Sequence, residues 1–229
     1  TSAQGRVYKS SLSQQTLMEL LIDGLTDKDE FSSSPGEIKD IRHWPGVILN
    51  ESNEVLNIFW AQEGLYGSID VQWMPLSVHY FAVSGNTLHG SLDLTDLPRG
   101  LTQSWMDDNR FEGGISLEWL PEALVVLDVS DNLLNGSLNL KKLPESLISL
   151  YLHENSFSGE IDLTNLPPKL PDLYLSDTRV TGITDFSRLP STLRNLRISN
   201  TDLSGEIHQR SDENFIVRGS NVTVKKTKS

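Results

Sequence analysis

Acidic side chains recur at a fixed interval of 23 residues in the middle of the chain, at Asp108, Asp131, Glu154 and Asp177. Carboxylates repeated in this way can attract a basic partner or, as a second reading, supply oxygen ligands to Ca²⁺. The alternative is a set of solvated charges that keeps the protein soluble. We carry the strip forward as a candidate surface for a basic partner, leave the solubility alternative open, and predict no metal site and no cofactor.

Large aromatic side chains follow the same interval, three positions before the acidic ones. They are Phe59, Trp105, Tyr151 and Tyr174; Asp128 and Arg197 take that position in other units, and Tyr80 precedes it by two residues. Exposed aromatic residues are enriched where binding energy is concentrated. The alternative is that β-propensity alone favours these residues on strands. The pattern favours a binding face.

No catalytic arrangement is recognisable. The chain has no cysteine, which excludes disulfides, thiol catalysis and thiolate metal sites. None of the five histidines has metal-ligand spacing, and we interpret His153 as a surface contact. We therefore predict that the protein is not an enzyme. The predicted partner-binding residues are Phe59, Tyr80, Trp105, Asp107, Asp108, Asp128, Asp131, Tyr151, His153, Glu154, Tyr174, Asp177 and Arg197.

These residues are positioned by an uninterrupted 23-residue repeat. Seven repeats begin at Val55, Val78, Leu101, Leu124, Leu147, Leu170 and Leu193, and each has glycine at its thirteenth position. A period of 20–29 residues with leucines spaced L-x-x-L-x-L-x-x-N is the signature of a leucine-rich solenoid. We expect parallel β-strands on the concave face, extended and 3₁₀ segments on the convex face, and a helical N-terminal cap: an α/β-type leucine-rich repeat solenoid.

Each position of the repeat has a predicted role. Positions 4 and 6 alternate as inward-facing strand residues, and the asparagine at position 9 can bond the backbone of adjacent repeats. Threonine replaces it at Thr178 and Thr201, where we expect a weaker ladder. The glycine at position 13 permits a positive φ. Ser104 and Thr184 interrupt the apolar pattern and predict a locally thinner core.

We divide the chain into three parts. Residues 1–54 are predicted to form an N-terminal cap with a helix over about 11–25, in which Ser11 and Gln14 form a capping box. Residues 55–207 hold the seven repeats. Residues 208–229 are predicted to form a C-terminal cap, with a closing strand or hairpin, and a basic tail that includes Lys228.

The charge distribution narrows the partner class. The net charge is −12, and residues 1–168 hold 9 basic against 24 acidic side chains. An acidic body repels phosphates, which argues against nucleic acid. No apolar run approaches the roughly 18 residues that a membrane span needs. We expect a protein or peptide partner, basic in character.

The repeat residues resemble known proteins. The strand pattern over residues 55–207 resembles leucine-rich repeat proteins generally. The outer segment 155–167, NSFSGEIDLTNLP, resembles a 23-residue repeat of kinetoplastid leucine-rich proteins, and its L-x-G-x-I portion is shared with plant-type repeats. The segment 44–47, WPGV, resembles a plant-type N-terminal cap without its two cysteines. The resemblance implies protein–protein interaction without catalysis.

We therefore predict a non-enzymatic interaction module or scaffold, located in the cytoplasm because the cysteines are missing. The alternative is the outer portion of a cell-surface receptor or adhesin. The plant-like cap, and the chance that a leader was removed, keep that alternative open.

Overall fold

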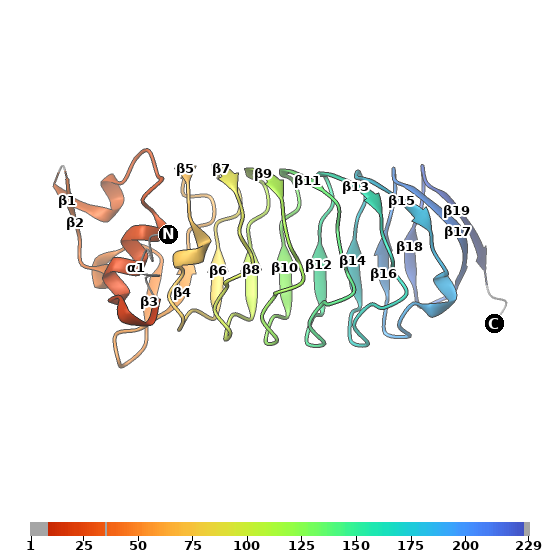
Figure 1. Cartoon of the computed structure of the whole chain (residues 1–229), viewed down its shortest axis with the longest axis horizontal. Helices are drawn as coiled ribbons and strands as arrows, with labels where there is room; N and C mark the ends of the chain where they lie inside the picture. The colour runs from red at the N-terminus through yellow and green to blue at the C-terminus, as the bar shows by residue number, and fades with distance from the viewer. Residues whose placement is uncertain (1–8, 35, 227–229) are drawn as a thin grey trace, which may run out of the picture.

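The computed structural model describes residues 9–34 and 36–226, and it shows an elongated solenoid with the N-terminal cap at one end and the C-terminal strands at the other (Figure 1). Two sheets run along its length, one of nine strands and one of eight. The predicted leucine-rich repeat architecture is confirmed. No helix in the described part of the chain is long and apolar enough to cross a membrane.

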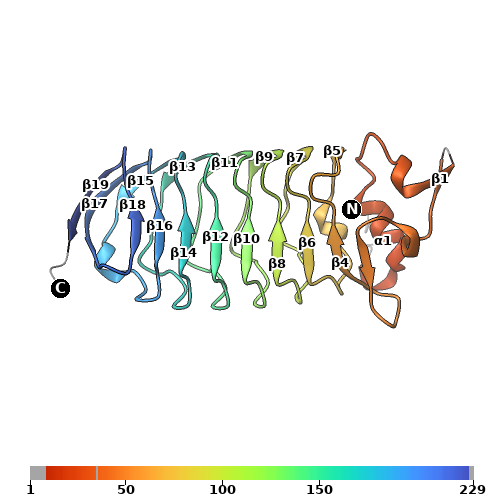
Figure 2. The ribbon, with the colours of Figure 1, turned by 180° about the vertical axis from the view of Figure 1, so that it is seen from behind.

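The nine-stranded sheet is the one predicted from positions 3 to 5 of the repeat, and its strands lie side by side in Figure 2. The strands are parallel, except that β3 pairs antiparallel with β4. Positions 4 and 6 are buried as predicted, with Leu127 and Val129 both 0% exposed. In order along the sheet, the strands are β18 (Asn214–Ile216), β16 (Asn195–Arg197), β14 (Asp172–Tyr174), β12 (Ser149–Tyr151), β10 (Val126–Asp128), β8 (Gln103–Trp105), β6 (Tyr80–Ala82), β4 (Val55–Phe59) and β3 (Val47–Leu49).

The eight-stranded sheet is formed by the segments around the repeat glycine. The sequence predicted extended segments here, and the structure pairs them into a parallel ladder because equal repeat lengths bring them into register. Each repeat glycine has a positive φ, for example +83° at Gly113, as predicted. In order, the strands are β19 (Asn221–Lys226), β17 (Asp202–Gln209), β15 (Arg179–Ile183), β13 (Ser156–Glu160), β11 (Leu133–Gly136), β9 (Arg110–Gly114), β7 (Thr87–Ser91) and β5 (Tyr66–Ser68).

The segments that close each repeat contain turns and two short 3₁₀ helices, η4 (Val71–Trp73) and η5 (Phe186–Arg188). An aspartate caps each of them: Asp70 accepts from the Gln72 amide, and Asp185 accepts from the Ser187 amide. Proline follows both helices in the sequence and prevents a longer helix. The predicted 3₁₀ segments are confirmed in these two repeats.

The asparagine at position 9 links consecutive repeats. The Asn109 side chain donates to the Val83 carbonyl at 2.9 Å and accepts from the Leu88 amide at 3.0 Å. Asn86, Asn132 and Asn155 make equivalent bonds. At Thr178 the hydroxyl only donates back to Leu175 in its own repeat, at 2.7 Å. The ladder is weaker toward the C-terminus, as predicted.

The N-terminal cap contains a shorter helix than predicted. Helix α1 spans Gln14–Leu21, and Ser13, not Ser11, caps it by accepting from the Thr16 amide at 3.0 Å. The helix stops early because the following chain pairs with the first repeat: the Ser68 amide donates to the Gly24 carbonyl at 2.9 Å. The remaining elements of the cap are η1 (Lys9–Ser11), η2 (Asp29–Phe31), β1 (Ser32–Ser34), β2 (Glu37–Ile38) and η3 (Ile41–His43).

Three aromatic rings fill the end of the core between the cap and the repeats. The Phe31 ring centroid lies 4.9 Å from that of Trp44 and 5.2 Å from that of Trp60. Both indole N–H groups donate to backbone carbonyls, of Lys39 and Pro45. The cap therefore covers apolar side chains that the first repeat would otherwise expose.

The C-terminal residues form an eighth turn of the solenoid: the predicted closing strand is present, whereas its alternative, a hairpin, is not formed. β18 pairs parallel with β16, and β19 pairs parallel with β17. Phe215 aligns with Leu196, only 19 residues earlier, so the seventh repeat is four residues shorter than the others. Gly219 has a φ of +78° and makes the turn between the two strands. Lys228 of the predicted basic tail lies outside the described residues.

The two departures from the apolar pattern are both buried. Ser104 is 0% exposed and Thr184 is 5% exposed. Neither hydroxyl oxygen has a hydrogen-bond partner. Ser104 lies between Phe81 and Leu127 in the sheet register, where other repeats place large apolar residues. At these two positions the core contains unpaired buried polar groups, which cost stability; the thinner core stays a prediction.

Candidate binding surface

The solvent-facing side of the nine-stranded sheet carries all of the predicted partner-binding residues, on the consecutive strands from β4 to β16 and the turns that follow them. Side chains at positions 3 and 5 face this side because positions 4 and 6 point into the core. The residue at position 8 lies in the turn that follows each strand, at the edge of the sheet. The structure therefore brings the sequence-predicted residues onto one face.

Every position-8 residue has a left-handed backbone. The φ values are +51° at Asp108, +52° at Asp131, +51° at Glu154 and +56° at Asp177. Aspartate tolerates this conformation better than glutamate does, and glycine tolerates it best. Gly85 occupies the same position in the second repeat, which is a signal that the sequence analysis did not use. The acidic strip is thus a row of turn residues whose carboxylates stand at the edge of the sheet.

The aromatic side chains form two clusters rather than one continuous patch. Near the N-terminal end, the ring centroids of Phe59 and Tyr80 are 4.7 Å apart. Farther along, the centroids of Tyr151 and Tyr174 are 4.8 Å apart, and the Arg197 guanidinium carbon lies 4.4 Å from the Tyr174 ring. Trp105 lies between the clusters, half-buried, with its indole N–H donating to Gln103 at 3.3 Å.

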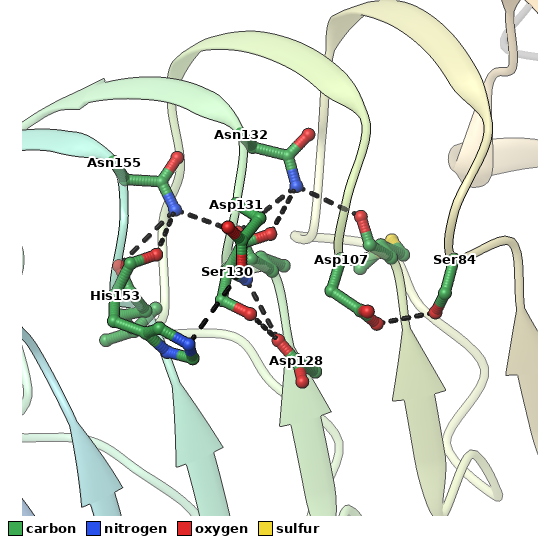
Figure 3. A network of polar contacts seen from close by, with 11 residues as sticks. Ser84, Asp107, Asp128, Ser130, Asp131, Asn132, His153 and Asn155 are labelled. Atoms are coloured by element: carbon green, nitrogen blue, oxygen red, sulfur yellow. Dashed lines mark hydrogen bonds and ion pairs between the residues drawn. The ribbon is translucent and has the colours of Figure 1, made fainter.

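His153 joins the second cluster to the acidic strip. Its ring lies 5.8 Å from that of Tyr174. Its Nε2 is 3.9 Å from an Asp131 carboxylate oxygen (Figure 3). Its buried Nδ1 has no hydrogen-bond partner. Burial lowers the pKa of His153, and the negative charge of Asp131 opposes that shift. Burial therefore favours the neutral imidazole at this negatively charged edge.

Asp128 is the main departure from the sequence analysis, which grouped it with the solvent-facing residues of the predicted binding face. It is only 8% exposed, between Trp105 on β8 and Tyr151 on β12 in the sheet register. Its Oδ1 accepts from the amide and the hydroxyl of Ser130, at 2.9 and 2.6 Å (Figure 3). Burial raises the pKa of Asp128 to about 6, and the charges of Asp107 and Asp131 act in the same direction.

Serines at position 7 orient two of these carboxylates, a role that the sequence analysis missed. The Ser84 hydroxyl donates to the Asp107 carboxylate of the next repeat at 2.5 Å. The Ser130 hydroxyl donates to the Asp128 carboxylate within its own repeat. The signal was present in the sequence, because position 7 is polar in the repeats that hold these residues. A serine hydroxyl beside a carboxylate reduces the carboxylate's freedom to turn away.

Potential metal ligands of Asp131, His153 and Glu154 lie within 4.8 Å of one another. Asp131 raises the pKa of Glu154, through a side-chain hydrogen bond first and then through its charge. We assign no metal to this group, since exposed carboxylates on adjacent turns approach each other without an ion and the Asp131 side chain is 42% exposed. The close carboxylates instead create a local excess of negative charge at the sheet edge.

A separate hollow lies on another face of the solenoid. A cavity of about 590 Å³ opens among the outer segments of the fourth to sixth repeats. Leu138, Ile161 and Ile183 line it, and Ile183 is 89% exposed. This cavity shares no residue with the sheet face, so binding at the two places can be separated by substitution.

No protein-family profile matches the sequence, and the search of curated proteins found no match. Solved structures do resemble the fold. The chain matches Pollen Receptor Kinase 3 with a TM-score of 0.55 and 22% identity, covering 91% of this chain and 95% of that one. It matches the Arabidopsis receptor kinase HAESA, solved with the peptide hormone IDA and the co-receptor SERK1, with a TM-score of 0.59 and 23% identity over 85% of this chain.

A third match is the plant peptide hormone receptor RGFR1 in complex with RGF2, with a TM-score of 0.55 and 24% identity over 71% of this chain. The chain spans 38% of the length of HAESA and 28% of that of RGFR1. At these identities the likeness concerns the fold. The sequence period, the two parallel sheets and these matches together make the chain a leucine-rich repeat solenoid.

Proposed function

We propose that this chain is a non-enzymatic protein-interaction module whose nine-stranded sheet face binds a protein or peptide segment. The observation that carries the proposal is the pair of aromatic clusters on this face, with carboxylates along its edge. The partner segment carries apolar residues for the aromatic clusters and basic residues for the acidic edge. Such a surface has a dry centre and a charged rim, which is the anatomy of protein interfaces.

The aromatic clusters supply the apolar part of the interface. Phe59 is 42% exposed although it touches Tyr80. Tyr151 and Tyr174 are half-buried against each other and keep part of their rings in solvent. Covering these surfaces with a partner removes more apolar area from water at little cost in side-chain freedom, since the rings are already packed.

The acidic edge supplies the electrostatic part. Four position-8 carboxylates line the edge and, with Asp107, give it a single sign of charge. Complementary charge accelerates association and selects against acidic partners. The same charge repels phosphates, so nucleic acid is a poor partner for this face.

A second candidate is the outer portion of a cell-surface receptor. The likeness to receptors solved with the peptide hormone IDA and with RGF2 favours it. The cytoplasmic location stays a prediction that these matches do not support. Imaging of the full-length protein, tagged in its native cells, distinguishes the two: a surface signal supports the receptor, and an internal signal supports the scaffold. The likeness of the outer segment to kinetoplastid repeats remains part of the proposal, as does the division of the chain at residues 54 and 207.

The test is selection of a random 12-residue phage peptide library on the purified chain, followed by affinity measurements on paired variants. Trp105→Ala is compared with Trp119→Ala, because Trp119 is 65% exposed and lies outside the sheet face. Tyr151→Ala is compared with Tyr66→Ala, because Tyr66 is 50% exposed on β5 of the other sheet. Each sheet-face substitution should weaken binding by about 1–3 kcal/mol, and each control by less than about 0.5 kcal/mol.

Two outcomes contradict the proposal. One is that the selected peptides bind both sheet-face variants with unchanged affinity. The other is that Ile183→Asp, in the outer cavity, abolishes their binding. Either result would move the interaction to another face of the solenoid.

A further inference from the structure

Asp128 occupies an unusual place for a carboxylate. It lies on the solvent side of the sheet, yet the side chains around it leave it only 8% exposed. Trp105 and Tyr151 are its register neighbours on either side. Its Oδ1 accepts two hydrogen bonds from Ser130, and no ion pair formed among residues 9–34 and 36–226 involves Asp128. A buried carboxylate without a countercharge is costly, which makes its position here informative.

The spacing around Asp128 suits a cation. Neighbouring strands are about 4.8 Å apart, so the backbones of Trp105 and Tyr151 are separated by about 9.5 Å, and a group midway lies within about 6 Å of either position. Attraction between a cation and an aromatic ring operates over that range. The same row of the sheet already contains such a contact, because the Arg197 guanidinium lies over the Tyr174 ring.

We propose that Trp105, Asp128 and Tyr151 form a recess that receives the arginine or lysine side chain of a bound peptide segment. This inference rests on the proposed function and specifies its partner. The cation supplies the countercharge that Asp128 lacks, and the two aromatic side chains cover its apolar stem and its charged face. The carboxylates of Asp107 and Asp131, whose charges already act on Asp128, draw the basic residue toward the recess.

The position of Asp128 distinguishes this recess from the acidic strip as a whole. The position-8 carboxylates stand in exposed turns, where a bound cation keeps most of its water and contributes little. Asp128 is shielded, so an ion pair formed there is stronger and orients the peptide along the face. One basic residue of the bound segment should therefore contribute much more to the binding affinity than its other basic residues.

The experiment uses peptides selected from the random phage library on the unmodified chain. In a selected peptide, each arginine is replaced by citrulline and each lysine by norleucine, one at a time, which removes the charge with little change in shape. We expect one such replacement to weaken binding to the unmodified chain about 10- to 100-fold. The same replacement should change binding to the Asp128→Asn variant less than about 3-fold, because the charge partner is already gone. Asp202→Asn, which removes an exposed carboxylate from β17 of the other sheet, is the matched control, and it should keep the full dependence.

The outcomes separate the inference from the proposed function. Peptides that lose affinity for Trp105→Ala or Tyr174→Ala but have no essential basic residue would overturn the recess and leave the binding face in place. A dependence on the basic residue that survives Asp128→Asn would also overturn the recess. Peptides whose affinity is unchanged by every sheet-face substitution would overturn both.

Discussion

Asparagine in place of Asp128 should stabilise the protein, and the gain should grow with pH. The side chain is 8% exposed, and burial raises its pKa from 3.8 to about 6. The folded protein therefore holds this proton more tightly than the unfolded chain does. The contribution of Asp128 to the stability of the folded protein therefore falls as the pH rises from about 4 to about 6, because its carboxylate must then ionise in a buried place. In the Asp128→Asn variant the amide oxygen can still accept the two hydrogen bonds from Ser130, so the turn is preserved.

The size of the effect follows from the two pKa values. Because the pKa of Asp128 is about 6 in the folded protein, against an ordinary value of 3.8, its ionisation lowers the free energy of unfolding. The loss is about 3 kcal/mol at pH 7, about 1.5 kcal/mol at pH 5 and about 0.5 kcal/mol at pH 4. The new amide N–H₂ group needs an acceptor and reduces the gain at every pH by a similar amount. We therefore expect Asp128→Asn to raise the free energy of unfolding by about 1–3 kcal/mol at pH 7. The change caused by the substitution should be about 2.5 kcal/mol smaller at pH 4 than at pH 7.

The assay is urea unfolding followed by circular dichroism at pH 4, 5, 6 and 7, on the unmodified chain and on two variants. Asp108→Asn is the control, because it removes an exposed carboxylate from a turn that asparagine also tolerates. It should change the free energy of unfolding by less than about 0.5 kcal/mol at pH 7. A difference for Asp128→Asn that is the same at all four pH values would refute the assignment of a buried, hard-to-ionise carboxylate.

Three further predictions concern the turns, the repeat glycine and metal ions. Glu154→Asn should stabilise the protein by about 0.5–1 kcal/mol in thermal or urea unfolding at pH 7, because asparagine tolerates a φ of +51° better and removes a charge beside Asp131; destabilisation would contradict the strain argument. Gly113→Ala should lower the free energy of unfolding by about 1–2 kcal/mol because of its φ of +83° alone, since a Cβ has room there. Gly67→Ala should lower it clearly more, because the new Cβ would lie 2.4 Å from a backbone oxygen. Equal losses in the same assay would show that packing does not matter at these glycines. Addition of about 1 mM EDTA should leave the melting temperature and peptide affinity unchanged, and a drop in either would reveal a structural or binding metal.

The repeat period predicted the parts of the fold that depend on local pattern. Position 6, as at Val129, and the repeat glycine, as at Gly113, could be assigned because the same environment returns every 23 residues. The eighth turn was missed because Phe215 follows Leu196 by 19 residues, which takes it out of the period. Spacing alone does not reveal a shortened repeat.

The sequence predicted on which face of the sheet the candidate site residues lie, but not how deeply each of them is buried. Alternation along the strand places Trp105 and Asp128 on the same face, and the structure agrees. The burial of Asp128 depends on the volume of neighbours from two other repeats, which no single repeat encodes. The left-handed turn at Asp131 was hidden for a related reason: an aspartate adopts it without any mark in the repeat itself, and only comparison with Gly85 reveals it.

The most direct test of the binding face is a crystal structure of the chain with a library-selected peptide bound. We predict that the peptide lies across the nine-stranded sheet, in contact with Trp105, Tyr151 and Tyr174, with one basic side chain between Trp105 and Tyr151 above Asp128. A peptide seated instead in the outer cavity beside Ile183, or along the edge of β19, would contradict the central claim.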